Sequence, residues 1–414
     1  MSRGGSSSAT ISPSGGLKLG LSPRPNPGFE RAVEHQWRTS HKSYIISHRD
    51  ASDSYKMSFM RVDDWSTYRE TRNWPQLDGL RAVSILLVLA FHMHDPIWTR
   101  LYGGRGVTLF FVISGFLITS LLLREQERTG KLSLRGFYIR RTFRIMPLYF
   151  LALSLATILV LAFDLGQGGN DFLHRLPLLA TFNGEFAGSG TFSHSWSLGI
   201  EEKFYLVWPV LLTTPMISRR LGTITAILIL MAAFAAFSPT FGYFGIYTPI
   251  ISGCAIAIAM HYKRSYAHIS FIARPASAYA ALMIFLLVLI FPNPFGIEEQ
   301  SKYAHVLFGL AAALAFPGVL IGHTIHRRLM ELSPIVEFGK LAYPIYLFHP
   351  FILEVVDRVV APGSSNPLHS IPRLIAVVLI TTTAAVVINK CFADPLNEFG
   401  HRISRRTLRN VATS

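Results

Sequence analysis

The sequence is poor in cysteine and in charged residues. Only two cysteines, Cys254 and Cys391, occur in 414 residues, and each lies in or at an apolar segment. This excludes a disulfide framework or a cysteine-based metal site, and we expect both thiols to be inert core groups. Charged residues make up 15% of the chain and hydrophobic residues 50%. That composition is typical of a membrane protein and not of a soluble globular domain.

A secretory signal and internal repeats are also absent. The N-terminus has no short apolar core, which excludes a signal peptide. Residues 1–73 are polar, and the first thirty are rich in Ser, Gly and Pro, so we expect a largely disordered cytoplasmic segment. Met57 and Met60 lie just upstream of the hydrophobic region and are candidates for the natural start. The lack of a repeat argues against a transporter built from paired repeats.

Long apolar stretches dominate the rest of the chain, and a membrane-spanning helix needs ~20 mostly apolar residues. We therefore predict an all-α, polytopic helix bundle in a membrane domain of residues 74–395, followed by a basic tail of residues 396–414. Ten spans are predicted, at 77–95, 106–123, 145–163, 195–214, 221–238, 243–262, 276–292, 302–322, 341–358 and 372–391.

Acidic residues are scarce as well, and the net charge is +15. Such a charge fits either nucleic-acid binding or a membrane protein with basic cytoplasmic loops. Nineteen Lys and Arg residues lie on one set of alternate loops and in the tail, and six lie on the other set. The asymmetry favours the membrane interpretation and predicts that both termini are cytoplasmic, with no nucleic-acid partner.

The first predicted span carries ionisable residues at both ends. Arg81 and His92 are eleven residues apart; the helix turns by about 20° beyond three full turns between them, so they share a face, roughly 16 Å apart along the axis. Asp95 follows His92 by three residues and is predicted to orient its imidazole. Either His92 is a general base, or it is a solvated histidine at the membrane interface, as the neighbouring His94 and Pro96 allow.

The basic segment before the third span carries Arg141 and Arg144 on one helical face. Arginine binds phosphate through its planar fork of donors. The pair therefore fits a nucleotide-phosphate cofactor such as coenzyme A. Two other interpretations fit the pair equally well, because both are common for basic loops. The arginines could anchor a helix end at the cytoplasmic surface, or they could bind a lipid headgroup.

Helix 195–214 carries a polar stripe. His194 and Glu201 are seven residues apart, and Ser197 and Tyr205 flank Glu201 at four residues on either side. Lipid would reject this stripe, so it must face the bundle interior, as a site or as a buried hydrogen-bond network. Three other residues lie outside these sets. Gly115 and Ser114 favour close helix packing over chemistry, and His349 is either a core histidine or a second site residue.

Five motifs, in order, resemble the acyltransferase-3 family of integral membrane O-acyltransferases. They are Leu-Asp-Gly-Leu-Arg at 77–81 with histidine eleven residues after the arginine, Phe-Phe-Val-Ile-Ser-Gly-Phe-Leu-Ile-Thr at 110–119, Arg-Arg-Thr-Phe-Arg-Ile-Met-Pro at 140–147, Trp-Ser-Leu-Gly-Ile-Glu-Glu-Lys-Phe-Tyr at 196–205 and Tyr-Pro-Ile-Tyr-Leu-Phe-His at 343–349. The resemblance covers residues 74 to about 395.

The resemblance implies a ten-helix enzyme that moves an acyl group, often acetyl from acetyl-CoA, onto a hydroxyl of a sugar or lipid. The family's arginine and histidine fall on Arg81 and His92, its basic pair on Arg141 and Arg144, and its glutamate on Glu201 or the adjacent Glu202. Some relatives carry a fused hydrolase-like domain, which we expect this chain to lack. Thr108, Lys203 and Ala342 depart from the acidic residue, glutamine and serine usual at these positions, which bears on the substrate more than on the reaction.

We therefore expect an acyltransferase of the cell (inner or plasma) membrane, using acyl-CoA and no metal. Its catalytic residues would be His92, Asp95, Arg81 and Glu201, and Arg141 and Arg144 would bind the cofactor. The expected acceptor is a cell-surface sugar or polysaccharide. Acylation of a lipid or small molecule is the alternative within enzymes, and export of an acylated product without chemistry is the alternative outside them.

Overall fold

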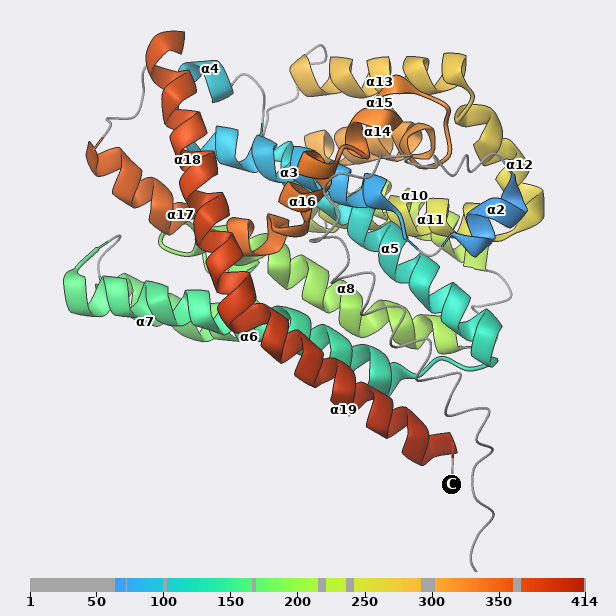
Figure 1. Ribbon diagram of the computed structural model, residues 1–414, viewed down its shortest axis with the longest axis horizontal. Helices are drawn as coiled ribbons and strands as arrows, with labels where there is room; N and C mark the ends of the chain where they lie inside the picture. The colour runs from blue at the N-terminus through green and yellow to red at the C-terminus, as the bar shows by residue number, and fades with distance from the viewer. Residues whose placement is uncertain are drawn as a thin grey trace, which may run out of the picture. The chain divides into compact units, whose positions relative to one another are not determined.

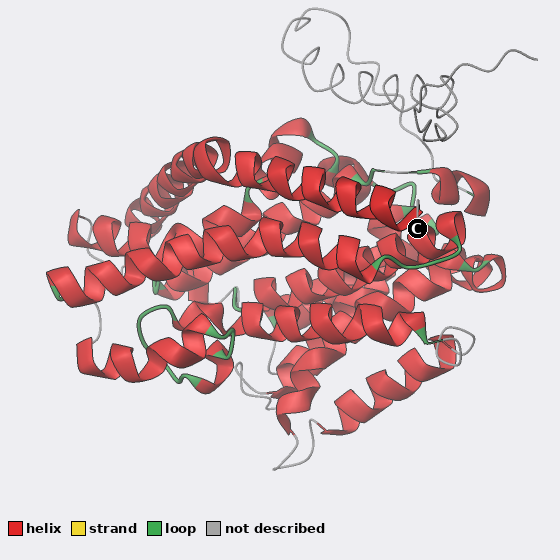
Figure 2. Cartoon of the chain, turned by 90° about the horizontal axis from the view of Figure 1, so that it is seen from below, coloured by secondary structure: helices red, strands yellow, loops and turns green. Residues whose placement is uncertain are grey.

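A computed structural model describes residues 64–71, 73–99, 103–165, 169–214, 221–235, 242–291, 302–359 and 366–412. The predicted disorder of the first thirty residues and the candidate starts Met57 and Met60 lie outside these ranges. Within them the regular structure is entirely helical, as predicted (Figure 2).

The helices range from 4 residues in α4 to 30 residues in α6. They are α2 (Trp65–Glu70), α3 (Pro75–His92), α4 (Pro96–Thr99), α5 (Arg105–Thr129), α6 (Leu134–Phe163), α7 (Gly169–Ala180), α8 (Trp196–Thr213), α10 (Leu221–Ala235), α11 (Thr248–His261), α12 (Lys263–Ile272), α13 (Pro275–Ile290), α14 (Lys302–Leu320), α15 (Ile325–Met330), α16 (Ser333–Lys340), α17 (Ala342–Val359), α18 (Pro367–Ile388) and α19 (Asp394–Ala412). Three 3₁₀ turns (Gly184–Phe186, Ser193–Ser195, Gly242–Tyr247) and a π-helical turn (Asn389–Ala393) join some of them.

Five helical stretches in the described ranges are long and apolar enough to cross a membrane. They are Arg105–Thr129, Leu134–Phe163, Phe244–His261, Tyr303–Leu320 and Leu368–Ser404, and a sixth is the pair Lys263–Ile272 and Pro275–Ile290, bent by 70°. The remaining four of the ten predicted spans overlap α3, α8, α10 and α17. By length and apolarity the structure thus supports five or six of the ten.

Helix α5 is the central element of the bundle. It packs against α3, α8, α11 and α14, and Figure 1 shows it passing between α3 and α8. The close approach to α11 depends on glycine: a Cβ on Gly115 would lie 1.8 Å from the carbonyl oxygen of Ile250, and one on Gly253 would lie 2.1 Å from that of Val112. The predicted packing role of Gly115 is confirmed.

Helix α19 extends the fold beyond the last predicted span. It lies alongside α6 (Figure 1), with the Ser404 hydroxyl accepting a hydrogen bond of 3.0 Å from Arg140 Nη1. The predicted boundary between residues 395 and 396 therefore falls inside a helix that packs on the body. Cys254 is buried as predicted. Cys391 is exposed, so the prediction that its thiol lies in the core is wrong. It lies on a π-helical turn whose buried residue is Ala393.

Candidate active site

A cavity of about 470 Å³ opens between α3, α5, α6, α8 and α17. Its basic side chains come from three separate stretches of sequence, and they face only two carboxylates. The charged residues that line it are Asp78, Arg81, Arg141, Arg144, Glu201 and Lys340. The excess of positive charge makes the cavity suited to an anionic ligand, because guanidinium groups bind phosphate and carboxylate oxygens in a fork.

The arginines are held in different ways. Arg81 forms an ion pair with Asp78, one turn before it on α3. The Arg141 guanidinium lies 3.8 Å from the centroid of the Tyr205 ring, a cation–π contact. Its Nε is buried and has no hydrogen-bond partner among the described residues. Arg144, one turn further along α6, opens into the same cavity. The predicted pair thus shares one cavity with Arg81, which sequence reasoning had placed with His92.

Glu201 belongs to a hydrogen-bond chain at the cavity wall. Its Oε1 accepts a bond of 2.5 Å from the Ser114 hydroxyl, and that hydroxyl oxygen accepts one of 3.1 Å from Tyr205. The prediction that the stripe on α8 faces the bundle interior is confirmed, since His194, Ser197 and Tyr205 are buried. Ser114, which the sequence indicated as a packing residue, links Glu201 to Tyr205 through hydrogen bonds.

His92 lies outside the cavity lining, at the last turn of α3. Its Nδ1 is 2.8 Å from the carbonyl oxygen of Val88. A carbonyl only accepts, so this bond requires a proton on Nδ1 and leaves Nε2 with a free lone pair in the neutral ring. The His92 ring centroid lies 4.8 Å from that of His349, which lies 5.5 Å from that of His194.

These three histidines, which we call the histidine cluster, bring together α3, α17 and the turn before α8. The Nε2 atoms of His194 and His349 are buried without a hydrogen-bond partner in the described structure. His349 is fully buried and lies beside His92, which is compatible with both interpretations, a core histidine and a second site residue. No group of three His, Cys, Asp or Glu residues within the described ranges is arranged to hold a metal ion.

Tyr346 separates the cavity from the histidine cluster. It lines the cavity, and its ring centroid is 5.6 Å from that of His194 and 5.8 Å from that of His349. Its hydroxyl donates to the His194 carbonyl at 2.5 Å and lies 2.7 Å from the Ser197 hydroxyl. Sequence reasoning missed Tyr346. The available signal was its place one helical turn before His349.

Asp95 forms a buried ion pair that the sequence did not predict. Its carboxylate forms an ion pair with Arg373 of α18, with 3.1 Å between Oδ2 and Nη1, and both side chains are 1% exposed. Arg373 also donates to the Met93 carbonyl oxygen at 2.8 Å and pairs with Asp357. These contacts were not predicted, and the orientation of His92 by Asp95 stays a prediction. α3 ends at His92 and the chain turns away at His94, whose φ is 56°, so the helical spacing no longer holds.

Replacing Asp95 with alanine is expected to destabilise the protein by about 3 kcal/mol, because it leaves a buried guanidinium without one of its partners. Thermal unfolding of the purified protein in detergent measures the change. Arg358→Ala, which breaks the exposed pair with Glu354, is the matched control and should change stability by less than about 0.5 kcal/mol. An Asp95→Ala protein of unchanged stability that has lost acyl transfer would instead support a role of Asp95 in orienting His92.

Comparison of the sequence with known proteins places the chain in a family. Residues 74–390 match the model of a family described as an acyltransferase domain. The chain is 27% identical over 348 residues to the peptidoglycan O-acetyltransferase OatA of Listeria monocytogenes, covering 76% of this chain and 55% of the relative. It is 28% identical over 371 residues to YrhL of Bacillus subtilis, provisionally named for the same activity, covering 80% and 56%.

The relatives are longer than this chain. A Staphylococcus aureus protein, SAS0844, provisionally named an O-acetyltransferase, is 27% identical over 333 residues, which is 73% of this chain and 54% of the relative. The chain thus spans about half the length of the curated relatives it matches. No solved structure matches it. Because the family model covers most of the chain, from the residues before α3 to the π-helical turn, the chain belongs to the acyltransferase-3 family.

Proposed function

We propose that the protein is a membrane O-acyltransferase that moves an acyl group, in the first instance acetyl, from acyl-CoA to a hydroxyl of a cell-surface polysaccharide. The observation that carries this proposal is the pairing of an arginine-lined cavity with a histidine cluster across Tyr346. The names of the Listeria and Bacillus relatives, which refer to peptidoglycan O-acetylation, support the acceptor class.

The donor would enter the cavity with its phosphates on Arg141, Arg144 and Arg81. Two features support acyl-CoA: several guanidinium groups converge on one space, and the basic loop next to them matches a cytoplasmic position. The pantetheine arm would then run towards Tyr346 and the histidine cluster. The separation of roughly 16 Å between Arg81 and His92 along α3 suits a long, flexible arm between phosphate and thioester.

In the transfer step, His92 Nε2 would take the proton of the acceptor hydroxyl while that oxygen attacks the thioester carbonyl carbon. The C–S bond breaks, the acyl group stays on the acceptor oxygen, and the CoA thiolate leaves and takes up a proton. General-base assistance of this kind is worth ~10²–10⁴-fold. Glu201 would fix the Ser114 and Tyr205 hydroxyls beside the donor, and Arg81 would stabilise negative charge on it.

The proposal includes a ten-span topology with both termini in the cytoplasm of a cell-membrane protein. The unequal Lys and Arg content of alternate loops supports it, as does the overlap of each predicted span with a helix. Helices α3, α8 and α17 would then cross the membrane inside the bundle, where they place polar side chains against each other. The short apolar helix α10 would cross with its exposed face against lipid.

Mass spectrometry of surface glycans from cells with and without the gene tests the proposal. Cells that carry the gene should show alkali-labile acetyl esters on the glycan, and cells without it, or with only the His92→Ala protein, should lack them. Unchanged glycans together with loss of an acylated lipid would favour the alternative acceptor. Acyl esters that persist inside the cell but no longer reach the surface would favour an exporter and overturn the enzymatic assignment.

A further inference from the structure

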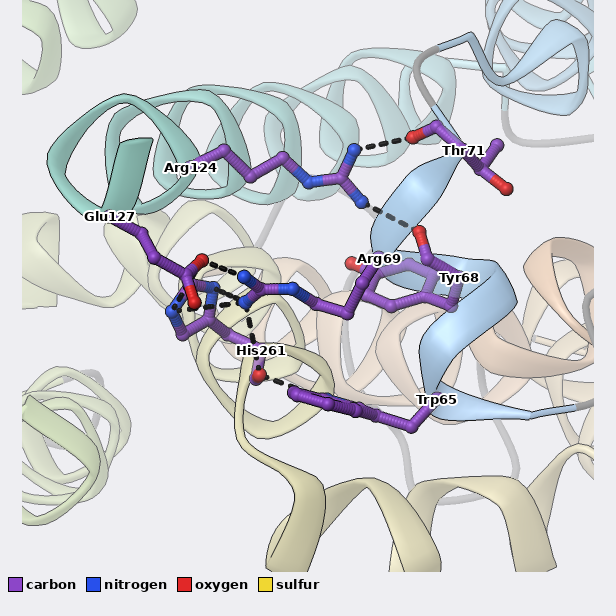
Figure 3. Close-up of polar contacts among 7 residues, drawn as sticks. All are labelled: Trp65, Tyr68, Arg69, Thr71, Arg124, Glu127 and His261. Carbon is purple, nitrogen blue, oxygen red and sulfur yellow. Dashed lines mark hydrogen bonds and ion pairs between the residues drawn. The ribbon is translucent and has the colours of Figure 1, made fainter. Parts of the chain in front are cut away.

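The short helix α2 is fastened to the ends of α5 and α11, as Figure 3 shows. Asp64 caps it by accepting a hydrogen bond of 2.7 Å from the Thr67 backbone, which lowers the pKa of Asp64 below its usual value. Trp65 Nε1 donates to the carbonyl oxygen of His261 at 3.0 Å. We call this arrangement the clasp; it comprises Trp65, Tyr68, Arg69, Thr71, Arg124, Glu127 and His261.

Arg124 of α5 makes the central contacts of the clasp. Its Nη2 donates to the Tyr68 carbonyl oxygen at 2.9 Å and its Nη1 donates to that of Thr71. The last carbonyls of a helix have no partner within the helix, so one guanidinium satisfies the end of α2. A second anchor lies beside it, where Arg69 pairs with Glu127 and lies 3.1 Å from His261 Nδ1 (Figure 3).

The clasp continues directly into the wall of the arginine-lined cavity. The Arg124 guanidinium lies 4.3 Å from the centroid of the Trp74 ring, and Tyr68 stacks on that ring at 6.0 Å. Trp74 and its neighbour Asn73 both line the cavity. The Trp74 side chain is 5% exposed, and its Nε1 is buried with no hydrogen-bond partner in the described structure. A buried donor of this kind is costly unless a ligand or another group accepts from it.

We propose that Arg124 is a positioning residue for the donor site: it holds Trp74 and Asn73 as the wall against which the nucleotide half of acyl-CoA packs. This inference rests on the proposed function. The aromatic face of Trp74 lies against a cation and an aromatic ring, so its orientation depends on the clasp. Arg124 does not line the cavity, and its effect on the donor therefore passes through Trp74.

Kinetics separate positioning from folding. Arg124→Ala should raise the KM for acetyl-CoA by roughly tenfold, equivalent to about 1.4 kcal/mol, and leave kcat per folded enzyme unchanged, because His92 is not touched. Arg124→Lys should recover part of the loss, since it keeps the charge but not the two-carbonyl fork. Arg128→Ala, an exposed arginine one turn further along α5, is the matched control and should behave as the parent protein. A normal KM in Arg124→Ala would overturn the proposal.

A readout that does not require turnover distinguishes this inference from the proposed function. Asn73→Cys, in a Cys391→Ser background, places a reactive thiol at the cavity wall. With Arg124 present, acetyl-CoA should slow its labelling by a water-soluble maleimide; with Arg124→Ala, that protection should fall. Equal rates and equal protection in both proteins would overturn the positioning role. If the labelling rate differs between the two proteins but acetyl-CoA protects neither, the acyl-CoA assignment is overturned. The role of the clasp in positioning the cavity wall is then still supported.

Discussion

Replacing His92 with alanine is expected to lower the rate of acyl transfer by ~10²–10⁴-fold, which is the contribution of a general base. The loss should appear in kcat and not in acetyl-CoA binding, because the base acts in the transition state and the cavity that would hold the donor does not include His92. The measurement is acyl transfer to the isolated acceptor by purified protein, together with acetyl-CoA binding by the same preparation.

His94 provides the matched control for that experiment. It is exposed, lies beyond the end of α3 and has a φ of 56°. His94→Ala therefore removes an imidazole of the same kind, two residues away, from outside the histidine cluster, and should leave most of the activity. A His92→Ala protein with full activity, or a His94→Ala protein with as deep a loss, would show that the base has been assigned wrongly.

Much of the helical architecture follows from hydrophobic runs, and the exceptions have identifiable causes. The runs locate α5, α6, α11, α14 and α18 because burial in lipid demands ~20 apolar residues. Helices α2 and α19 were not predicted, because both are rich in polar residues and lack the long apolar run on which the prediction depended. Contacts with other helices stabilise them. Arg124 of α5 binds the end of α2, and Gly136 and Arg140 of α6 form hydrogen bonds with Ser404 of α19.

The site was predictable where it depends on helical periodicity and not where it depends on long-range contacts. Arg141 and Arg144 share a face of α6 and do open into one cavity. The link from Glu201 to Tyr205 through Ser114 joins residues 87 and 91 positions apart, and no local pattern announces it. The ion pair of Asp95 was missed because helical spacing relates only neighbouring residues, whereas Arg373 lies 278 positions away.

Arg141 and Arg144, which line one cavity as predicted, are the best residues at which to test the proposed donor. Replacing both Arg141 and Arg144 with alanine should weaken acetyl-CoA binding by about a hundredfold, because each lost charged hydrogen bond costs ~1.5–3 kcal/mol. The protein should stay folded in the membrane, since neither arginine has an ion-pair partner among the described residues and the core side chain of Tyr205 beside Arg141 is retained. Titration with acetyl-CoA, monitored by calorimetry in detergent, gives the dissociation constant directly.

Arg140 is the control, because it precedes Arg141 and faces the other way, towards Ser404 and Glu125. Arg140→Ala removes the same charge from the same helix, α6, without touching the cavity. Donor affinity should therefore stay within about twofold of the parent value if the arginine fork matters and not the charge. Lysine at positions 141 and 144 should recover only part of the affinity, since an ammonium cannot make the bidentate contact. Equal affinity in the double alanine protein and the Arg140→Ala protein would reduce the pair to anchors of a helix end and place the donor elsewhere.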